Sequence, residues 1–596
     1  MTLTGLGQLL LFFVLLLAIT KPLGAYMARV FEGTRTVLSP VLVPLEQLVY
    51  KLTGIRKEEE QHWTQYAGAC LAFGLVNFLI FYVLQRGQTL LPLNPEHLGT
   101  PRALPGSVPL TPDLAFNTAV SFMTNTSWQS YPGETTLSYF SQMVGIAVQS
   151  FTSAAAGMAV AVALVRGFAR REACTLGNFW VDLTRATLYV LLPLSLAGAL
   201  FLGSQGVIQN FRAYRTVKTV EGRQQIIPGG PVASQESIKL LSSDGGGFFN
   251  ASSAHPFENP TPFTNIFEML LIIAIPAGMT YTFGRMVGDR HQGWTLFCVM
   301  LVLLVGGSLI GYSSEQHSNP ILVRLGIDRS ASGSNPGGNL EGKEVRFGNA
   351  GSALFSVVST ATSSGAVNGM HDSYTPLGGL VQMFNMKSGE VIFGGPGSGL
   401  YGMLLITLVA IFIAGLMVGR TPEYLGKKIH GREIKMVMLS MIACFACILV
   451  LTASGTLVRF HPSGYWNPPG PLTANLNNSG PHGFSEILYA YASATGNNGS
   501  SFAGLNTNTP WYNLTIGLAM LIGRFFVIIP ALAVAGSLAA KKKLAVTMGT
   551  MPTHGLLFSL LLLGTIIIVA ALTFLPAFSV GPIVEQFLLN ACSVAG

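Results

Sequence analysis

The chain has 596 residues, of which 50% are hydrophobic and only 10% are charged. An ordinary soluble domain carries about 25% charged residues, so this composition excludes a soluble multidomain protein and indicates an integral membrane protein. The formal net charge of +8 is divided among short connections between apolar runs. It forms no basic stripe on a polar domain, so we expect no nucleic-acid partner.

Ten apolar runs are long enough to cross a bilayer, whose ~30 Å hydrocarbon core needs about 20 residues of helix. The first run has no basic residue before it and no small-residue cleavage site in the right place, so we interpret it as a span and not as a signal peptide. We predict an all-α polytopic membrane protein with spans at residues 4–25, 65–86, 137–165, 183–203, 264–287, 294–312, 399–418, 434–456, 514–538 and 554–579.

Basic residues mark alternate connections between these spans. They gather at 26–63, at 166–182, around Arg285 and Arg290, and again at 420–435 and 541–543. Short connections rich in Lys and Arg face the cytoplasm. We therefore expect both termini, together with the remaining connections, to lie outside.

Four of the outward connections share one organisation. A short amphipathic run leads into a loop of small residues, and the next span follows. The four runs are 113–123, 237–242, 352–359 and 484–492. The four loops read Thr124-Asn-Thr-Ser-Trp128, Ser243-Asp-Gly-Gly-Gly247, Thr362-Ser-Ser-Gly-Ala366 and Asn497-Asn-Gly-Ser500. Aligned on Ser127, Gly245, Gly365 and Gly499, they lie 118, 120 and 134 residues apart.

A single loop of this kind would be read as an ordinary turn. Four of them at nearly equal spacing, each between two spans and all on one side, favour a shared role. The short runs suit re-entrant half-helices, since non-helical backbone at membrane depth persists only where it lines a cavity or is buried in protein. Four converging loops can offer backbone carbonyls to a dehydrated potassium ion. The pattern therefore predicts a potassium selectivity filter.

Five long motifs make a family resemblance specific. They resemble the potassium-binding (A) subunit of the bacterial Kdp-type potassium-transporting ATPase, within the superfamily of four-repeat potassium transporters. The resemblance covers essentially the whole chain and is carried by Phe116–Tyr131, Gly245–Thr261, Gly365–Asp372, Gly389–Gly402 and Gly419–Lys428.

The resemblance implies four span–pore-helix–span repeats around a central filter, with one extra helix at each end. The spans then group into an extra helix with its connection (1–63), repeats at 64–166, 167–288, 289–420 and 421–540, and a last helix (541–596). It also implies a multi-pass location in the bacterial cytoplasmic (inner) membrane.

The family's ion-coordinating positions transfer to three residues in each loop. The superfamily tends to place glycine at the aligned position, where the first loop has Ser127. Asp244 stands where a neutral residue is expected, and it either tightens cation binding or points away. The resemblance implies potassium binding at Asn125, Thr126, Ser127, Ser243, Asp244, Gly245, Ser363, Ser364, Gly365, Asn497, Asn498 and Gly499.

Polar groups lie beneath the predicted filter. The run Gly394-Gly-Pro-Gly-Ser-Gly399 disfavours a regular helix. By pattern alone it is either unwound backbone beside an ion path or a loop that ends before the span; the resemblance favours a constriction that includes Gly394 and Gly395. Arg524 lies inside the ninth span, where a charge is a functional candidate. Gln129 and Glu390 are its candidate partners. The resemblance implies that these residues begin an intramembrane tunnel, with Arg524 repelling cations from a direct way down.

The sequence contains neither of the motifs that would let the chain hydrolyse ATP by itself. The phosphorylated Asp-Lys-Thr-Gly motif of ion-pumping ATPases is absent from the sequence, and so is a complete phosphate-binding loop. We therefore predict a non-catalytic subunit without cofactors that transports K⁺. Its partners would be a P-type ATPase catalytic subunit, which hydrolyses ATP, and small accessory membrane subunits. The alternative is a self-contained four-repeat potassium channel or cation symporter, and an inverted-repeat solute symporter is a more distant one.

Overall fold

The structure is a computed structural model that describes residues 1–104, 106–317, 319–328, 330–332, 335–458, 475–545 and 551–594. Ten helical runs in these residues are long and apolar enough to cross a membrane. Each coincides with one of the ten predicted spans, which confirms the all-α polytopic fold. They are α1 (Leu3–Phe31), α3 (Trp63–Arg86), η2 with α6 (Ser141–Ala169), α7 with η3 and α8 (Phe179–Ser204), α10 (Pro262–Met286), α11 (Arg290–Gln316), α15 (Ser398–Val418), α16 (Gly431–Leu457), α18 (Pro510–Ala539) and α19 with η6 and α20 (Leu556–Val594).

Shorter elements connect these helices. Two small antiparallel sheets pair β1 (Arg215–Lys218) with β2 (Gln224–Ile227), and β3 (Glu423–Tyr424) with β4 (Lys427–Lys428). The other short helices are α2 (Ser39–Thr53), η1 (Gln88–Leu90), α4 (Pro112–Met123), α5 (Gly133–Thr136), α9 (Val232–Leu241), η4 (Ser252–Ala254), α12 (Pro320–Arg324), α13 (Gly348–Ala361), η5 (His371–Ser373), α14 (Pro376–Lys387) and α17 (Gly480–Thr495).

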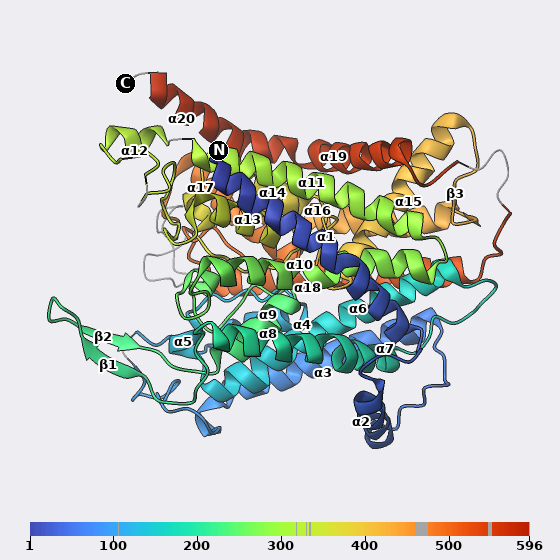
Figure 1. The fold of residues 1–596 in the computed structure, drawn as a ribbon, viewed down its shortest axis with the longest axis horizontal. Helices are drawn as coiled ribbons and strands as arrows, with labels where there is room; N and C mark the ends of the chain where they lie inside the picture. Colours follow the sequence, from blue (N-terminus) through green and yellow to red (C-terminus); the bar gives the residue numbers. More distant parts are fainter. Residues whose placement is uncertain are drawn as a thin grey trace.

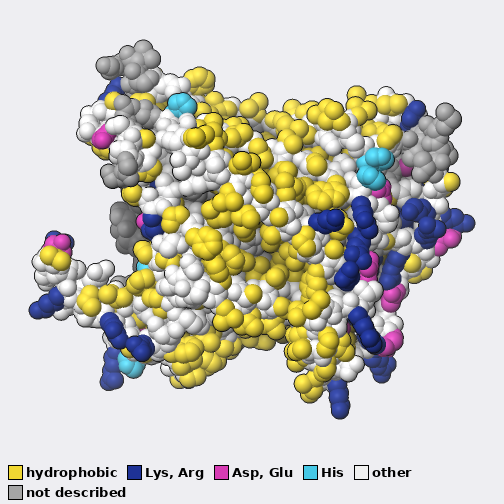
Figure 2. All heavy atoms as spheres, in the orientation of Figure 1, with side chains coloured by type: hydrophobic (Ala, Val, Ile, Leu, Met, Phe, Trp, Pro, Cys, Tyr) yellow, Lys and Arg dark blue, Asp and Glu magenta, His cyan; other side chains and the backbone are white. Residues whose placement is uncertain are grey.

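The long helices run roughly side by side, and both ends of the chain lie at the same end of the bundle (Figure 1). Figure 2 shows hydrophobic side chains across the middle of this face, a concentration of Lys and Arg along the opposite end from α2 upwards, and a smaller group of them beside β1 and β2. A soluble protein would bury such an apolar band, whereas lipid can cover it. The separation of basic residues from the termini agrees with the predicted orientation.

The centre of the bundle is built from helices of small residues. Every residue from Ala154 to Val165 of α6 is buried. A Cβ added at Gly167 would lie 2.7 Å from the carbonyl oxygen of Ala535, so α6 and α18 approach each other almost backbone to backbone. Small residues favour this close packing between membrane helices. The two helices thereby hold the residues of the first and fourth repeats at fixed positions.

Four buried short helices sit where the sequence places the re-entrant segments. They are α4, α9, α13 and α17, and each lies in the chain between two of the spanning helices. In α4, the Thr111 side chain caps the helix by accepting a hydrogen bond from the Leu114 amide, which defines its N-terminus. This order agrees with four span–pore-helix–span repeats, whose exact boundaries remain a prediction.

We expect Lys343→Met to lower the free energy of unfolding by about 3–5 kcal/mol, the cost of leaving one member of a buried ion pair alone. Lys343 Nζ lies 2.8 Å from Glu315 Oε2, and neither side chain is exposed. Thermal unfolding in detergent measures the effect. Lys57→Met is the control, since Lys57 and Glu58 are 61% and 73% exposed and 3.8 Å apart. Equal decreases in the free energy of unfolding for the two variants would contradict the assignment of Lys343 and Glu315 as a stabilising buried ion pair.

Candidate ion-binding loop ring

The loops that follow the four short helices meet and close into a ring. We call Asn125–Ser127, Ser243–Gly245, Ser363–Gly365 and Asn497–Gly499 the loop ring. All of these residues are buried except Gly245 and Gly499, which are partly exposed. They come from segments up to several hundred residues apart, and the predicted triplets are thus brought together in space.

At least one hydrogen bond joins each loop of the ring to the next loop or to the short helix before it. Asn125 Nδ2 donates to the Ser242 carbonyl (3.1 Å), and the Ser364 hydroxyl donates to the Asp244 carbonyl (3.3 Å). Asn498 Nδ2 donates to the Ser359 carbonyl (3.2 Å). Asn497 Nδ2 donates to Thr126 Oγ1 (2.8 Å) and closes the ring. The ring is therefore a single cross-braced unit.

Glycines permit the close approach between neighbouring loops. A Cβ added at Gly245 would lie 2.8 Å from Gly365 Cα, and one at Gly365 would lie 2.1 Å from the Asn498 carbonyl oxygen. At Gly499 the added atom would meet the Thr126 carbonyl oxygen at 2.0 Å. These distances are shorter than any real Cβ contact, so a side chain at these positions would push the loops apart.

The backbone of the loop ring follows a repeated pattern of left-handed residues. In three loops the first and third residues of the triplet have positive φ: Asn125 and Ser127, Ser363 and Gly365, and Asn497 and Gly499. The second loop has positive φ at Ser243 but not at Gly245. Left-handed residues that alternate with ordinary ones turn successive carbonyls towards one side. The positive φ values of the non-glycine residues are strained and are held by the surrounding bonds.

The side chains of the loop ring mainly brace it. Ser243 Oγ donates to the Ile272 carbonyl (2.9 Å), and Asn125 Oδ1 accepts from the Ser153 hydroxyl (2.9 Å). Asp244 is fully buried and lies beside the hydroxyls of Ser127 and Ser150. The hydroxyls of Ser127 and Ser363 and both carboxylate oxygens of Asp244 are buried without a hydrogen-bond partner. The oxygens that can face an ion therefore include these side-chain groups as well as backbone carbonyls.

The four short helices point their C-terminal ends at the loop ring, because each loop directly follows the last helical turn. The C-terminal end of a helix carries a partial negative charge of about half an electron. Four such ends around one ring favour a cation at its centre. The loop ring therefore suits a monovalent cation without a full set of charged ligands.

Irregular backbone lies beneath the ring at the start of α15. The helix begins at Ser398, and the preceding residues 388–397 are turns and bends. Gly394 and Gly397 have positive φ, and a Cβ at Gly397 would lie 2.2 Å from the Gly157 carbonyl oxygen in the middle of α6. The segment is thus packed inside the protein at the depth of a spanning helix, as the interpretation of unwound backbone requires.

Arg524 lies in the same region and is 6% exposed. Its Nη2 donates to the Ser153 carbonyl on α6 at 2.8 Å. Glu390 is partly buried and lies near Ser398 and Arg524. The prediction that Gln129 pairs with Arg524 is wrong: Gln129 Oε1 accepts from the Gly247 amide (2.9 Å), and Nε2 donates to Tyr131 (3.2 Å). Gln129 braces the first loop against the second.

A cavity of about 60 Å³ connects these elements. It runs from the foot of the fourth loop, at Thr495 and Asn497, to Glu390 and Ser398, and its wall includes residues of α15, α16 and α18. A second, smaller cavity of about 20 Å³ is lined by Arg524 itself. Gly523, the residue before Arg524, lines the first cavity.

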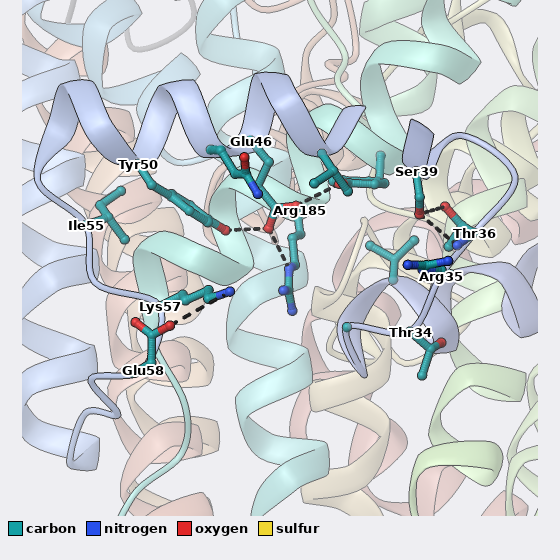
Figure 3. Close-up of a pocket in the computed structure, with 15 residues that line it drawn as sticks. Thr34, Arg35, Thr36, Ser39, Glu46, Tyr50, Ile55, Lys57, Glu58 and Arg185 are labelled. Carbon is teal, nitrogen blue, oxygen red and sulfur yellow. Dashed lines mark hydrogen bonds and ion pairs between the residues drawn. The ribbon is translucent and has the colours of Figure 1, made fainter. Parts of the chain in front are cut away.

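A separate pocket of about 370 Å³ lies between α2 and the start of the fourth span. Figure 3 shows its interior, where Glu46 accepts hydrogen bonds from Tyr50 (2.7 Å) and Arg185 (3.0 Å). Glu46 also accepts from Tyr189 (2.7 Å). None of the residues that line this pocket belongs to the loop ring, so we assign it a structural role in fastening α2 to the bundle.

Comparison with known proteins identifies the family of the chain. The family model described as "Potassium-transporting ATPase A subunit" matches residues 10–587. The chain belongs to the potassium-transporting ATPase A subunit family. A potassium-transporting ATPase potassium-binding subunit from Solibacter usitatus is 56% identical over 99% of both chains. One from Rhodospirillum centenum is 55% identical over the full length of both. The crystal structure of the potassium transporter TrkH from Vibrio parahaemolyticus superposes with a TM-score of 0.48 at 17% identity, covering 88% of this chain and 96% of that one. The family resemblance inferred from the motifs is thereby confirmed.

Sequence reasoning missed several groups around the loop ring of this A-subunit family member. The carbonyls of Ser242 and Ser359 accept bonds across two junctions, and Ser153 contacts both Asn125 and Arg524. The small-residue run that begins at Ser150 within an apolar span is the signal that could have indicated Ser153. Backbone acceptors such as Ser242 carry no residue-specific signal at all.

Proposed function

We propose that this chain is the potassium-selecting and potassium-binding subunit of an ATP-driven potassium uptake complex. It would capture external K⁺ in the loop ring and pass it to a P-type ATPase subunit, with small accessory membrane subunits alongside. The chain itself would be non-catalytic and would lie in the bacterial inner membrane with both termini outside. The observation that carries the proposal is the closed loop ring, with four helix ends directed at it.

The loop ring supports selection of a weakly hydrated cation. Potassium is selected where carbonyl oxygens replace its hydration shell at several adjacent sites. The alternating left-handed residues turn carbonyls to one side, and none of the ion pairs among the described residues involves a residue of the loop ring. The ion would therefore meet dipoles and the single carboxylate of Asp244. A dipolar site of this kind binds K⁺ without trapping it.

The space beneath the ring supports a sideways route. The cavity from Asn497 to Glu390 gives the ion a carboxylate at its far side. Arg524 and the buried segment around Gly394 and Gly395 would close the direct way down, because a fixed positive charge repels a cation. On this proposal Glu390 and Ser398 receive the ion, and the tunnel to the partner subunit starts at this cavity.

The test is to purify the tagged chain gently from its native membrane and identify what accompanies it. Co-purification of a P-type ATPase, with ATP hydrolysis stimulated by K⁺, is the expected result. A chain that purifies alone and conducts K⁺ in liposomes without ATP would overturn the proposal in favour of a channel or symporter. The family's A-subunit relatives carry the name of a potassium-binding subunit, which favours the first outcome.

A further inference from the structure

A cluster of titratable side chains lies away from the loop ring, where three distant parts of the chain meet. Asp372 follows the third ring loop in η5, His482 and Glu486 lie in α17, and Glu585 lies in α20. His482 and Glu486 are four residues apart and therefore share one face of their helix. Ligand atoms of Asp372, His482 and Glu486 all lie within 4.8 Å of one another.

We propose that Asp372, His482 and Glu486 bind one divalent transition-metal cation of the Zn²⁺ class. The inference goes beyond the proposed potassium function. Zinc is commonly bound by three protein ligands drawn from histidine and carboxylates, at about 2.0–2.2 Å. The three ligand atoms lie close enough together for one ion to contact all of them. The imidazole ligand favours a transition metal over Ca²⁺ or Mg²⁺, which prefer oxygen alone.

The hydrogen bonds of the cluster have the form of a metal site. His482 Nε2 lies 2.9 Å from Asp372 Oδ1, and its Nδ1 lies 2.7 Å from Glu585 Oε1. A histidine that binds a metal through one nitrogen usually holds a carboxylate with the other, which fixes the ring and raises its basicity. Glu585 occupies this second position, and Nε2 is left to face the ion.

The charges of the cluster also favour the binding of a cation. Three carboxylates, from Asp372, Glu486 and Glu585, surround a single histidine. Glu486 is fully buried, and its Oε2 atom has no hydrogen-bond partner although Oε1 accepts from Asn478 (3.1 Å). A buried carboxylate oxygen without a partner is costly. A metal ion would satisfy this oxygen and balance the negative charge.

An ion can reach the cluster from solvent. Asp372, His482 and Glu585 line a pocket of about 340 Å³. The side chains of His482 and Asp372 are 19% and 11% exposed, so they are held in place yet accessible.

A bound ion would join parts of the chain that otherwise meet through weaker contacts. It would tie the loop after the third ring segment to the pore helix α17, with α20 held through Glu585. The His482 ring also stacks on Phe502, and Phe502 stacks on Tyr489. Tyr489 OH is 2.8 Å from Ser500 Oγ, directly after the fourth ring loop. The ion would thus stiffen this end of the bundle.

The test uses the full chain, purified with a tag that contains no histidine and stripped with a chelator. Zn²⁺ is titrated while thermal unfolding is followed, and Co²⁺ is added separately because its visible absorption reports the ligand geometry. We expect Zn²⁺, but not Ca²⁺ at the same concentration, to raise the unfolding temperature. Absence of a Zn²⁺ effect on the wild-type chain would overturn the proposal.

Variants assign the binding to these residues. Glu486→Gln and Asp372→Asn keep the side-chain shape and should each weaken zinc binding by more than about 100-fold. Glu585 would contact His482 and not the metal, so Glu585→Gln should weaken zinc binding by about 10–100-fold. His317→Gln is the matched control, since His317 is exposed and lies outside the cluster. Zinc affinity unchanged in both Glu486→Gln and Asp372→Asn would place the metal elsewhere and refute the site.

Discussion

Gly365→Ala is expected to raise the K⁺ concentration needed for half-maximal transport by more than about tenfold, which corresponds to roughly 1.4 kcal/mol. The added Cβ would lie 2.1 Å from the Asn498 carbonyl oxygen and 2.8 Å from the Ser500 amide nitrogen. Neither atom can yield without displacing the backbone of the fourth loop. The φ of +78° adds strain for any residue with a Cβ, about 1–2 kcal/mol. K⁺-dependent uptake by cells that express the variant in place of the wild type measures the effect.

A control variant at Gly419 separates the effect of backbone strain from that of the steric clash inside the loop ring. Gly419 has a φ of +67°, and a Cβ there would meet nothing within 4 Å. Gly419→Ala carries the same backbone strain outside the loop ring, and it should leave the K⁺ dependence of transport unchanged.

Gly245→Asp should also degrade discrimination between K⁺ and Na⁺, because its side chain would meet Gly365 and carry a charge into the ring. Wild-type selectivity in Gly365→Ala and Gly245→Asp would count against a filter at this place.

Replacing the charge of Arg524 is expected to let K⁺ leak through the chain. Two like unit charges about 7 Å apart repel by roughly 2.4 kcal/mol at an effective dielectric constant of about 20, which is ~50-fold in occupancy. Arg524→Gln removes this repulsion but retains an amide that can donate to the Ser153 carbonyl. We expect passive K⁺ flux in liposomes without ATP to rise by at least tenfold.

Arg524→Lys is the matched variant, because it keeps the positive charge and alters the hydrogen bond. The passive K⁺ flux through this variant should be as low as that through the wild type. If instead the Lys variant leaks and the Gln variant does not, the hydrogen bond to α6 and not the charge is what matters. A Gln variant with no added leak would remove Arg524 from the proposed route.

The sequence was sufficient to predict the spans, because a run of about 20 apolar residues has few alternatives in a bilayer. It also predicted the four short helices, since an amphipathic run as short as 113–123 between two spans cannot cross. The loop positions followed from the same order. These features depend on local composition, which a single sequence displays directly.

The bonds that close the loop ring could not be predicted in this way. They join groups far apart in the chain, and three of the four acceptors are backbone carbonyls, such as that of Ser242, which every residue possesses. Positive φ at Asn125 and Ser127 was equally hidden, since these residue types usually adopt ordinary backbone angles. Gln129 was misassigned for a related reason: its side chain has two possible bonding ends, and only the geometry shows that Gly247 and Tyr131 occupy both.

The bond from Asn497 to Thr126 closes the loop ring across 371 positions of sequence. During synthesis the first loop therefore leaves the ribosome long before its partner exists. A nascent chain that stops after the third repeat has three loops and an open side, so it lacks the enclosing geometry that an ion requires. On the proposed function, completion of the site is thereby coupled to insertion of the fourth repeat, and a partly made chain would form no selective site in the membrane.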